Sequence, residues 1–100
     1  MLAAVFKGNG ILELENIRKP ELQSQAEVRI KVLGSGICGS DLHILHVPPG
    51  QYAKPGTVLG HEFFGRIEAV GEEVDDFTPG DYVAADPILK CGNCFYCKNG

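Results

Sequence analysis

The stretch GHEFFGRIEAVGEEV, residues 60–74, carries the clearest structural signal in the sequence. Phe63 to Val70 is rich in aromatic and apolar side chains and predicts a β-strand. Gly65, inside this strand, predicts a bulge or a close approach of another backbone. His61 and Glu62 stand directly before the strand, so we expect an imidazole and a carboxylate at its start.

A third metal-binding side chain lies upstream, in the segment Cys38-Gly39-Ser40-Asp41-Leu42-His43. The thiolate of Cys38 and the imidazole of His61 suit a borderline-soft ion such as Zn²⁺, and Glu62 offers a neighbouring carboxylate. Three protein ligands with a fourth position left for water or substrate are typical of a catalytic zinc. The sequence therefore predicts a zinc enzyme or a part of one.

Other segments predict short strands, and their spacing favours a small mainly β barrel or sandwich. Asn9-Gly10 is a favoured pair for a tight hairpin. Alternation of apolar and charged residues predicts that Val28, Ile30 and Val32 face the core. The expected strands are Ala3 to Phe6, Leu12 to Glu15, Glu27 to Val32 and Tyr82 to Ala85.

Between the strands, Gly39 to Leu45 predicts one or two helical turns, which Pro48-Pro49 end. The glycines of Gly34-Ser35-Gly36-Ile37-Cys38-Gly39 also fit the pattern of a Rossmann phosphate loop. About nine residues separate Gly39 from the prolines, however, whereas a crossover connection needs a dozen or more. We interpret these glycines as allowing a kinked backbone that delivers Cys38 to a metal.

Composition narrows the class of protein. The hydrophobic fraction of 44% and the charged fraction of 22% are ordinary for a globular chain. The formal net charge is −4 and no basic stripe is present, which argues against nucleic acid as a partner. No apolar run is long enough to cross a membrane, and the first residues lack the features of a signal peptide. We therefore expect a cytoplasmic protein whose cysteines are thiols or metal ligands.

A second cluster of thiols, Cys91-x₂-Cys94-x₂-Cys97, stands near the other end of the sequence. This spacing is compatible with a structural zinc lobe, for which a fourth ligand would be needed. Bacterial ferredoxins begin with the same spacing, so an iron–sulfur cluster is the alternative. The cluster interpretation leaves Gly60-His61-Glu62 unexplained, and zinc is the favoured metal.

The motif that starts at Gly60 resembles the signature G-H-E-x₂-G-x₅-G-x₂-V of the zinc-containing alcohol dehydrogenases of the medium-chain family. Every fixed position of the signature is present, through Gly65, Gly71 and Val74. The resemblance implies a GroES-like, partly open β-barrel with a short helix and a cysteine-rich zinc lobe. It also implies that residues 1–100 form the amino-terminal catalytic domain, and that the Rossmann domain of the family is not within this sequence.

The resemblance also implies roles for individual residues. Cys38 and His61 are similar to ligands of the catalytic zinc, and Glu62 to the neighbouring carboxylate, which binds the metal in the polyol-dehydrogenase branch. Asp41 is similar to the carboxylate that holds the ligand histidine, although capping of the short helix is an alternative role. The resemblance assigns Ser40 and His43 to proton transfer and Cys91, Cys94 and Cys97 to the structural zinc. His46 matches no motif.

The implied reaction is the transfer of a hydride from a secondary alcohol or polyol to NAD or NADP in the complete enzyme, which we expect to be a homo-oligomer. No residue of this sequence is assigned to the nicotinamide cofactor, so the 100 residues alone are expected to be inactive. Gly39 stands where some members carry a basic residue that meets the cofactor, and a glycine there is similar to polyol and threonine dehydrogenases. The competing hypothesis is a non-catalytic zinc-binding β module that acts through a partner chain.

Overall fold

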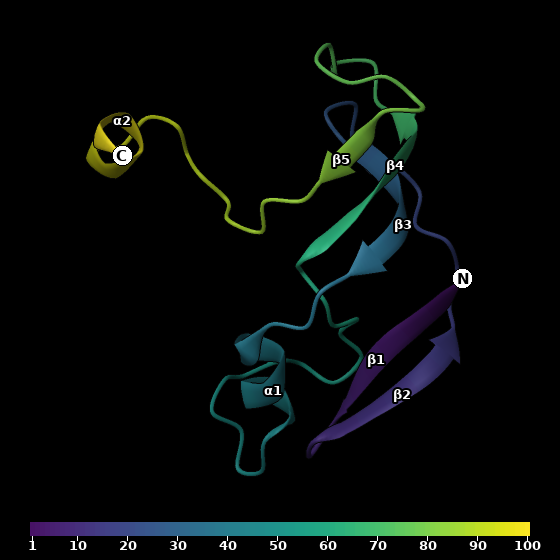
Figure 1. Ribbon diagram of the computed structural model, residues 1–100, viewed down its shortest axis with the longest axis vertical. Coiled ribbons are helices and arrows are strands. Elements are labelled where there is room, and N and C mark those ends of the chain that lie inside the picture. Colours follow the sequence, from purple (N-terminus) through teal and green to yellow (C-terminus); the bar gives the residue numbers. More distant parts are fainter.

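A computed structural model describes residues 1–100 and shows a mainly β chain with two short helices (Figure 1). Its strands form two antiparallel sheets, one with the order β1-β2 and one with the order β3-β4-β5. The prediction of a small mainly β fold is therefore confirmed. The elements are β1 (Leu2–Gly8), β2 (Ile11–Asn16), β3 (Val28–Ser35), α1 (Gly39–Leu45), β4 (Phe63–Val70), β5 (Tyr82–Ala84) and α2 (Phe95–Asn99).

The first sheet is the predicted hairpin. Asn9 and Gly10 adopt φ angles of 49° and 74°, and positive φ at both central residues is the geometry that Asn-Gly favours in tight hairpins. The inner strand β1 supplies three of the buried apolar residues of the chain, Ala3, Val5 and Phe6. The edge of β1 that faces away from β2 contacts the segment before β4, where the backbone N–H of Phe6 donates to the carbonyl of Thr57.

The second sheet brings β3 and β4 together along their whole length, from Val28↔Val70 to Ser35↔Phe63. Gly65 lies so close to β3 that a Cβ there would overlap the carbonyl oxygen of Lys31, which confirms the predicted close approach. Because the strands are antiparallel, the end of β3 and the start of β4 meet at the same end of the sheet. The segments that carry the predicted metal ligands begin at that end.

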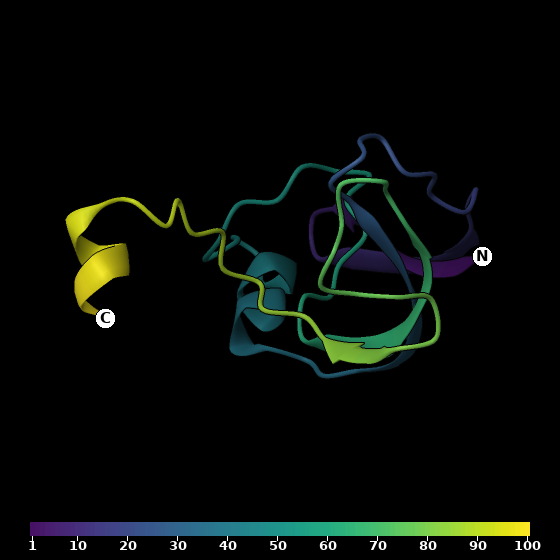
Figure 2. The ribbon, with the colours of Figure 1, turned by 90° about the horizontal axis from the view of Figure 1, so that it is seen from above.

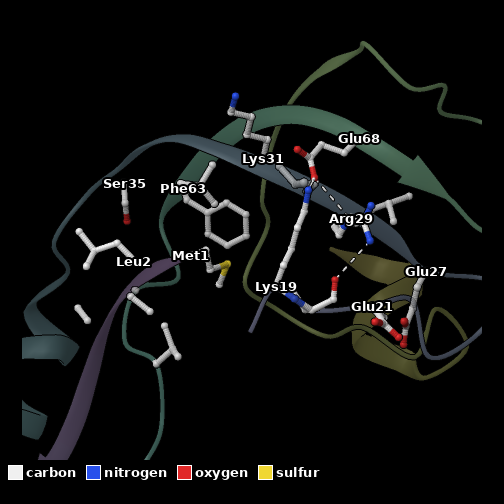
Figure 3. Close-up of a pocket in the computed structure, with 18 of the residues that line it drawn as sticks. Met1, Leu2, Lys19, Glu21, Glu27, Arg29, Lys31, Ser35, Phe63 and Glu68 are labelled. Atoms are coloured by element: carbon white, nitrogen blue, oxygen red, sulfur yellow. Dashed lines mark hydrogen bonds and ion pairs between the residues drawn. The ribbon is translucent and has the colours of Figure 1, made fainter. Parts of the chain in front are cut away.

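A hollow of about 730 Å³ opens between the hairpin and the second sheet. In Figure 3, Met1, Leu2 and Phe63 line its apolar side, while Lys19 and Arg29 approach the carboxylate of Glu68. Val28, Ile30 and Val32, the predicted core face of β3, line this hollow, and Val28 and Ile30 are half-buried. The prediction that Val32 is part of the core is wrong, because its side chain is 53% exposed.

The residues after β5 leave the sheets as an extended segment that ends in α2 (Figures 1 and 2). Both views place α2 and the carboxyl terminus well apart from the sheets, and all residues from Asp86 onward are exposed. The sequence analysis predicted a cysteine-rich lobe in this part of the chain but did not predict α2. Neither helix of the chain has the length and apolar character that a membrane span requires.

Candidate metal centre

The three predicted catalytic ligands converge. One donor atom from each of Cys38, His61 and Glu62 lies within 4.8 Å of the other two. The topology explains this, because Cys38 follows the last residue of β3 by three positions and His61 and Glu62 directly precede β4. The ladder continues past Ser35, where the backbone N–H of Gly36 donates to the carbonyl of Glu62 at 2.6 Å.

This donor set fits zinc in its chemistry. A sulfur, an imidazole nitrogen and a carboxylate oxygen are all common zinc ligands, and bond lengths of roughly 2.0–2.3 Å place tetrahedral ligands about 3.3–3.8 Å apart. The three donor atoms all lie within 4.8 Å of one another, so side-chain rotation can bring them to this spacing. Cys38 and His61 are half-buried and Glu62 is exposed, so the centre is open to solvent on one side.

Asp41 links two of the three donors. Its carboxylate accepts a hydrogen bond from the backbone N–H of Cys38 at 3.0 Å, which holds the first turn of α1. The other oxygen, Oδ1, lies 3.6 Å from Nδ1 of His61. Only 7% of Asp41 is exposed, so both contacts lie in a protected environment. The two roles considered for this residue, helix capping and orientation of the imidazole, are geometrically compatible.

Ser40 lies beside the imidazole of His61. Its hydroxyl is 3.3 Å from Nε2 of His61, the ring nitrogen that points away from Asp41. His43 follows one helical turn later and is exposed. Its ring packs near Gly50, where a Cβ would lie 3.3 Å from Nδ1 of His43, and no hydrogen bond joins it to Ser40. The structure thus brings Ser40 to the imidazole of His61 and leaves the ring of His43 exposed on α1.

The glycines before Cys38 do not form a phosphate loop. β3 pairs antiparallel with β4, and α1 has only seven residues, so the parallel β-α-β unit of a Rossmann fold is missing here. None of Gly34, Gly36 and Gly39 has a positive φ angle. Gly34 instead accommodates the ring of Phe64, and Gly36 accommodates the side chain of Glu62. Sequence reasoning identified these glycines but missed these two contacts.

The thiols of the lobe also converge. Sγ of Cys97 lies 3.8 Å from Sγ of Cys91 and 3.5 Å from Sγ of Cys94. Two thiolates bound to one tetrahedral zinc are about 3.8 Å apart, so the cluster fits a structural zinc lobe. Backbone N–H groups of Asn93 and Cys94, together with the neighbouring thiols, lower the pKa of Cys91 to about 7. All four cysteines of the chain are free, as predicted.

Comparison with known proteins agrees with this description. The family model "Alcohol dehydrogenase GroES-like domain" matches residues 24–100. Galactitol 1-phosphate 5-dehydrogenase of Escherichia coli (strain K12) is 45% identical over 100 residues, which are 100% of this chain and 28% of that protein. Sorbitol dehydrogenase of Bacillus subtilis (strain 168) is 45% identical over 103 residues, which cover 100% of this chain and 29% of that protein.

Solved structures show the same relationship. The crystal structure of galactitol-1-phosphate dehydrogenase from Escherichia coli superposes with a TM-score of 0.88 at 45% identity and covers 100% of this chain and 28% of that one. Acetophenone reductase from Geotrichum candidum NBRC 4597, solved in complex with NAD, gives a TM-score of 0.80 at 34% identity and covers 99% of this chain and 29% of that one. The chain thus spans less than a third of these relatives. It belongs to the zinc-type medium-chain alcohol and polyol dehydrogenases and corresponds to their GroES-like amino-terminal domain.

Proposed function

We propose that this chain holds the catalytic zinc of an NAD(P)-linked dehydrogenase that oxidises a secondary alcohol or a polyol. The observation that carries the proposal is the convergence of Cys38, His61 and Glu62 at the joined ends of β3 and β4. A chance cluster of surface carboxylates would contain only acidic side chains, and no nearby buried group would hold them in place. Here a thiol, an imidazole and a carboxylate come from two distant segments, and a buried carboxylate fixes two of them.

In this proposal Cys38, His61 and Glu62 hold the zinc, and Asp41 orients the ring of His61 so that Nε2 faces the ion. When bound, zinc acts as a Lewis acid that polarises the substrate oxygen and favours loss of its proton. Ser40, whose hydroxyl lies 3.3 Å from Nε2 of His61, accepts that proton while it donates its own hydroxyl proton to a neighbouring water. His43, exposed and one turn along α1, takes the proton from that water and releases it to bulk solvent.

The acceptor of the hydride in this proposal is NAD or NADP, since no protein side chain can accept a hydride. The complex of acetophenone reductase with NAD supports this class of cofactor. The names of two relatives, galactitol 1-phosphate 5-dehydrogenase and sorbitol dehydrogenase, support a polyol or a polyol phosphate as the substrate. Glu62, the carboxylate neighbour of the ligand histidine, is consistent with the polyol branch. We propose that Cys91, Cys94 and Cys97 hold a separate structural zinc.

Metal content and turnover test the proposal together. Zinc is measured in the purified chain, and turnover is measured in a chimera in which residues 1–100 replace the matching region of Escherichia coli galactitol 1-phosphate 5-dehydrogenase. We expect Cys38→Ser and His61→Ala each to remove one zinc per chain and to abolish NAD-linked oxidation of galactitol 1-phosphate.

His46→Ala is the matched control. His46 lies in the loop after α1, where Nδ1 is 3.1 Å from the carbonyl of Pro48, and it is outside the metal cluster. This variant should keep both zinc and turnover. If a chimera that carries Cys38→Ser or His61→Ala binds no zinc at this centre and still has full turnover, the proposed role of the metal is contradicted.

A further inference from the structure

Gly36 lies in direct contact with the carboxylate of a proposed zinc ligand. A Cβ built at Gly36 would stand 2.9 Å from Oε2 of Glu62 and 3.4 Å from its Cβ. The first distance is shorter than van der Waals contact allows, and the second is at the lower limit of ordinary contact. The carboxylate therefore occupies space that is free only because residue 36 has no side chain.

The surrounding backbone is fixed, so the carboxylate is the group that would move. The N–H of Gly36 donates to the carbonyl of Glu62 at 2.6 Å, and the hydroxyl of Ser35 donates to the same carbonyl at 3.3 Å. A Cβ at residue 36 would lie 3.6 Å from that carbonyl oxygen, which is a normal contact. Gly36 has no positive φ angle, so alanine fits its backbone conformation. Alanine would consequently push the end of the Glu62 side chain and leave the strand ladder in place.

We infer that Gly36 is a positioning residue for the metal centre: its missing side chain is what keeps the Glu62 carboxylate within ligand distance of Cys38 and His61. The inference rests on the proposed function, because it requires Glu62 to be a zinc ligand. The inference gives Gly36, two residues before the ligand Cys38, a specific structural role. Gly39, on the other side of Cys38, has no such role, because a Cβ there would meet no atom within 4 Å.

The test is a double-mutant cycle between Gly36→Ala and Glu62→Gln, read by metal affinity and not by activity. The purified chain is loaded with cadmium, and cadmium NMR separates the two centres because the all-thiolate lobe resonates apart from a mixed sulfur, nitrogen and oxygen centre. A competing chelator then gives the affinity of each centre. We expect Gly36→Ala to weaken the mixed centre by about tenfold, which is the usual scale for loss of a supporting contact.

The cycle separates this inference from the function on which it rests. If Gly36 acts through Glu62, Gly36→Ala adds no further loss to Glu62→Gln, and Gly39→Ala keeps the affinity of the unmodified chain. Unchanged amide NMR shifts of β1 and β2, which lie away from residue 36, show that each variant is folded. Unchanged affinity in Gly36→Ala beside a clear loss in Glu62→Gln would overturn the inference and leave the proposed ligands standing. Unchanged affinity in Glu62→Gln would overturn both the inference and the role of Glu62, while loss in Cys38→Ser would still support the centre itself.

Discussion

Replacing Asp41 by asparagine should weaken metal binding without weakening the fold. The carboxylate accepts from the N–H of Cys38 at 3.0 Å and faces Nδ1 of His61 at 3.6 Å, with 7% of the residue exposed. An asparagine oxygen can still accept the first hydrogen bond, so the free energy of unfolding should change by less than about 1 kcal/mol. The amide lacks the charge that attracts the ring N–H of a metal-bound imidazole. Zinc affinity should fall by about 10–100-fold, or about 1.4–2.7 kcal/mol.

The assay combines the chelator competition at the mixed centre with urea unfolding of the metal-free protein. Asp41→Ala should also lose the hydrogen bond from the backbone N–H of Cys38 to residue N3 of α1, which lowers the free energy of unfolding by about 0.5–1.5 kcal/mol. Asp81→Asn is the matched control, because Asp81 also accepts from the backbone N–H three residues earlier, Thr78, at 2.9 Å but lies outside the metal cluster. If Asp41→Asn binds zinc as tightly as the unmodified chain, Asp41 is only a helix cap and the reasoning about His61 is refuted.

Two further predictions concern the second sheet. Gly65→Ala should lower the free energy of unfolding by about 1–3 kcal/mol, because the added Cβ would overlap the carbonyl oxygen of Lys31, whereas Gly39→Ala should change it little; urea unfolding of both variants checks this. The hydrogen bond from Lys19 lowers the pKa of Glu68 below the ordinary glutamate value of 4.5. The ion pair therefore stabilises the fold fully at pH values above 4.5, and this stabilisation is lost as the pH falls through the lowered pKa. Lys19→Ala should raise that pKa back toward 4.5, and a carboxyl NMR titration showing no rise would contradict the assigned cause.

Local pattern was sufficient to predict most of the strands and the first helix. β4 and α1 begin and end at the predicted residues, and the Asn9-Gly10 turn has the expected positive φ angles. These features depend on interactions between near neighbours in the chain, which alternation, turn residues and prolines report directly. The convergence of Cys38 with His61 was an inference from residue types and family resemblance, and the antiparallel pairing of β3 with β4 supplies its structural reason.

What the sequence could not predict depends on contacts between distant segments. Alternation places Val32 on one face of β3, but it cannot tell whether another element covers that face, and here the face lines an open hollow. Likewise, the pattern of glycines in a sequence does not show whether a glycine is needed for its backbone conformation or because another group lies close to its Cα atom. Gly34 and Gly36 are needed because the side chains of Phe64 in β4 and of Glu62 just before β4 occupy the space beside them. That space is defined only by the β3–β4 register.

The register of this sheet therefore controls the candidate centre as well as the fold. Ser35 pairs with Phe63, and the ladder ends with the bond from Gly36 to Glu62, which lies at or within two residues of Cys38, His61 and Glu62. A slip of one residue in β3 would turn its side chains to the opposite face and would take Cys38 away from His61. A zinc ion held by these ligands would join the two strands at the point where the ladder ends. Metal binding and strand pairing should consequently stabilise each other, since a ligand that binds only the folded state adds its binding free energy to stability.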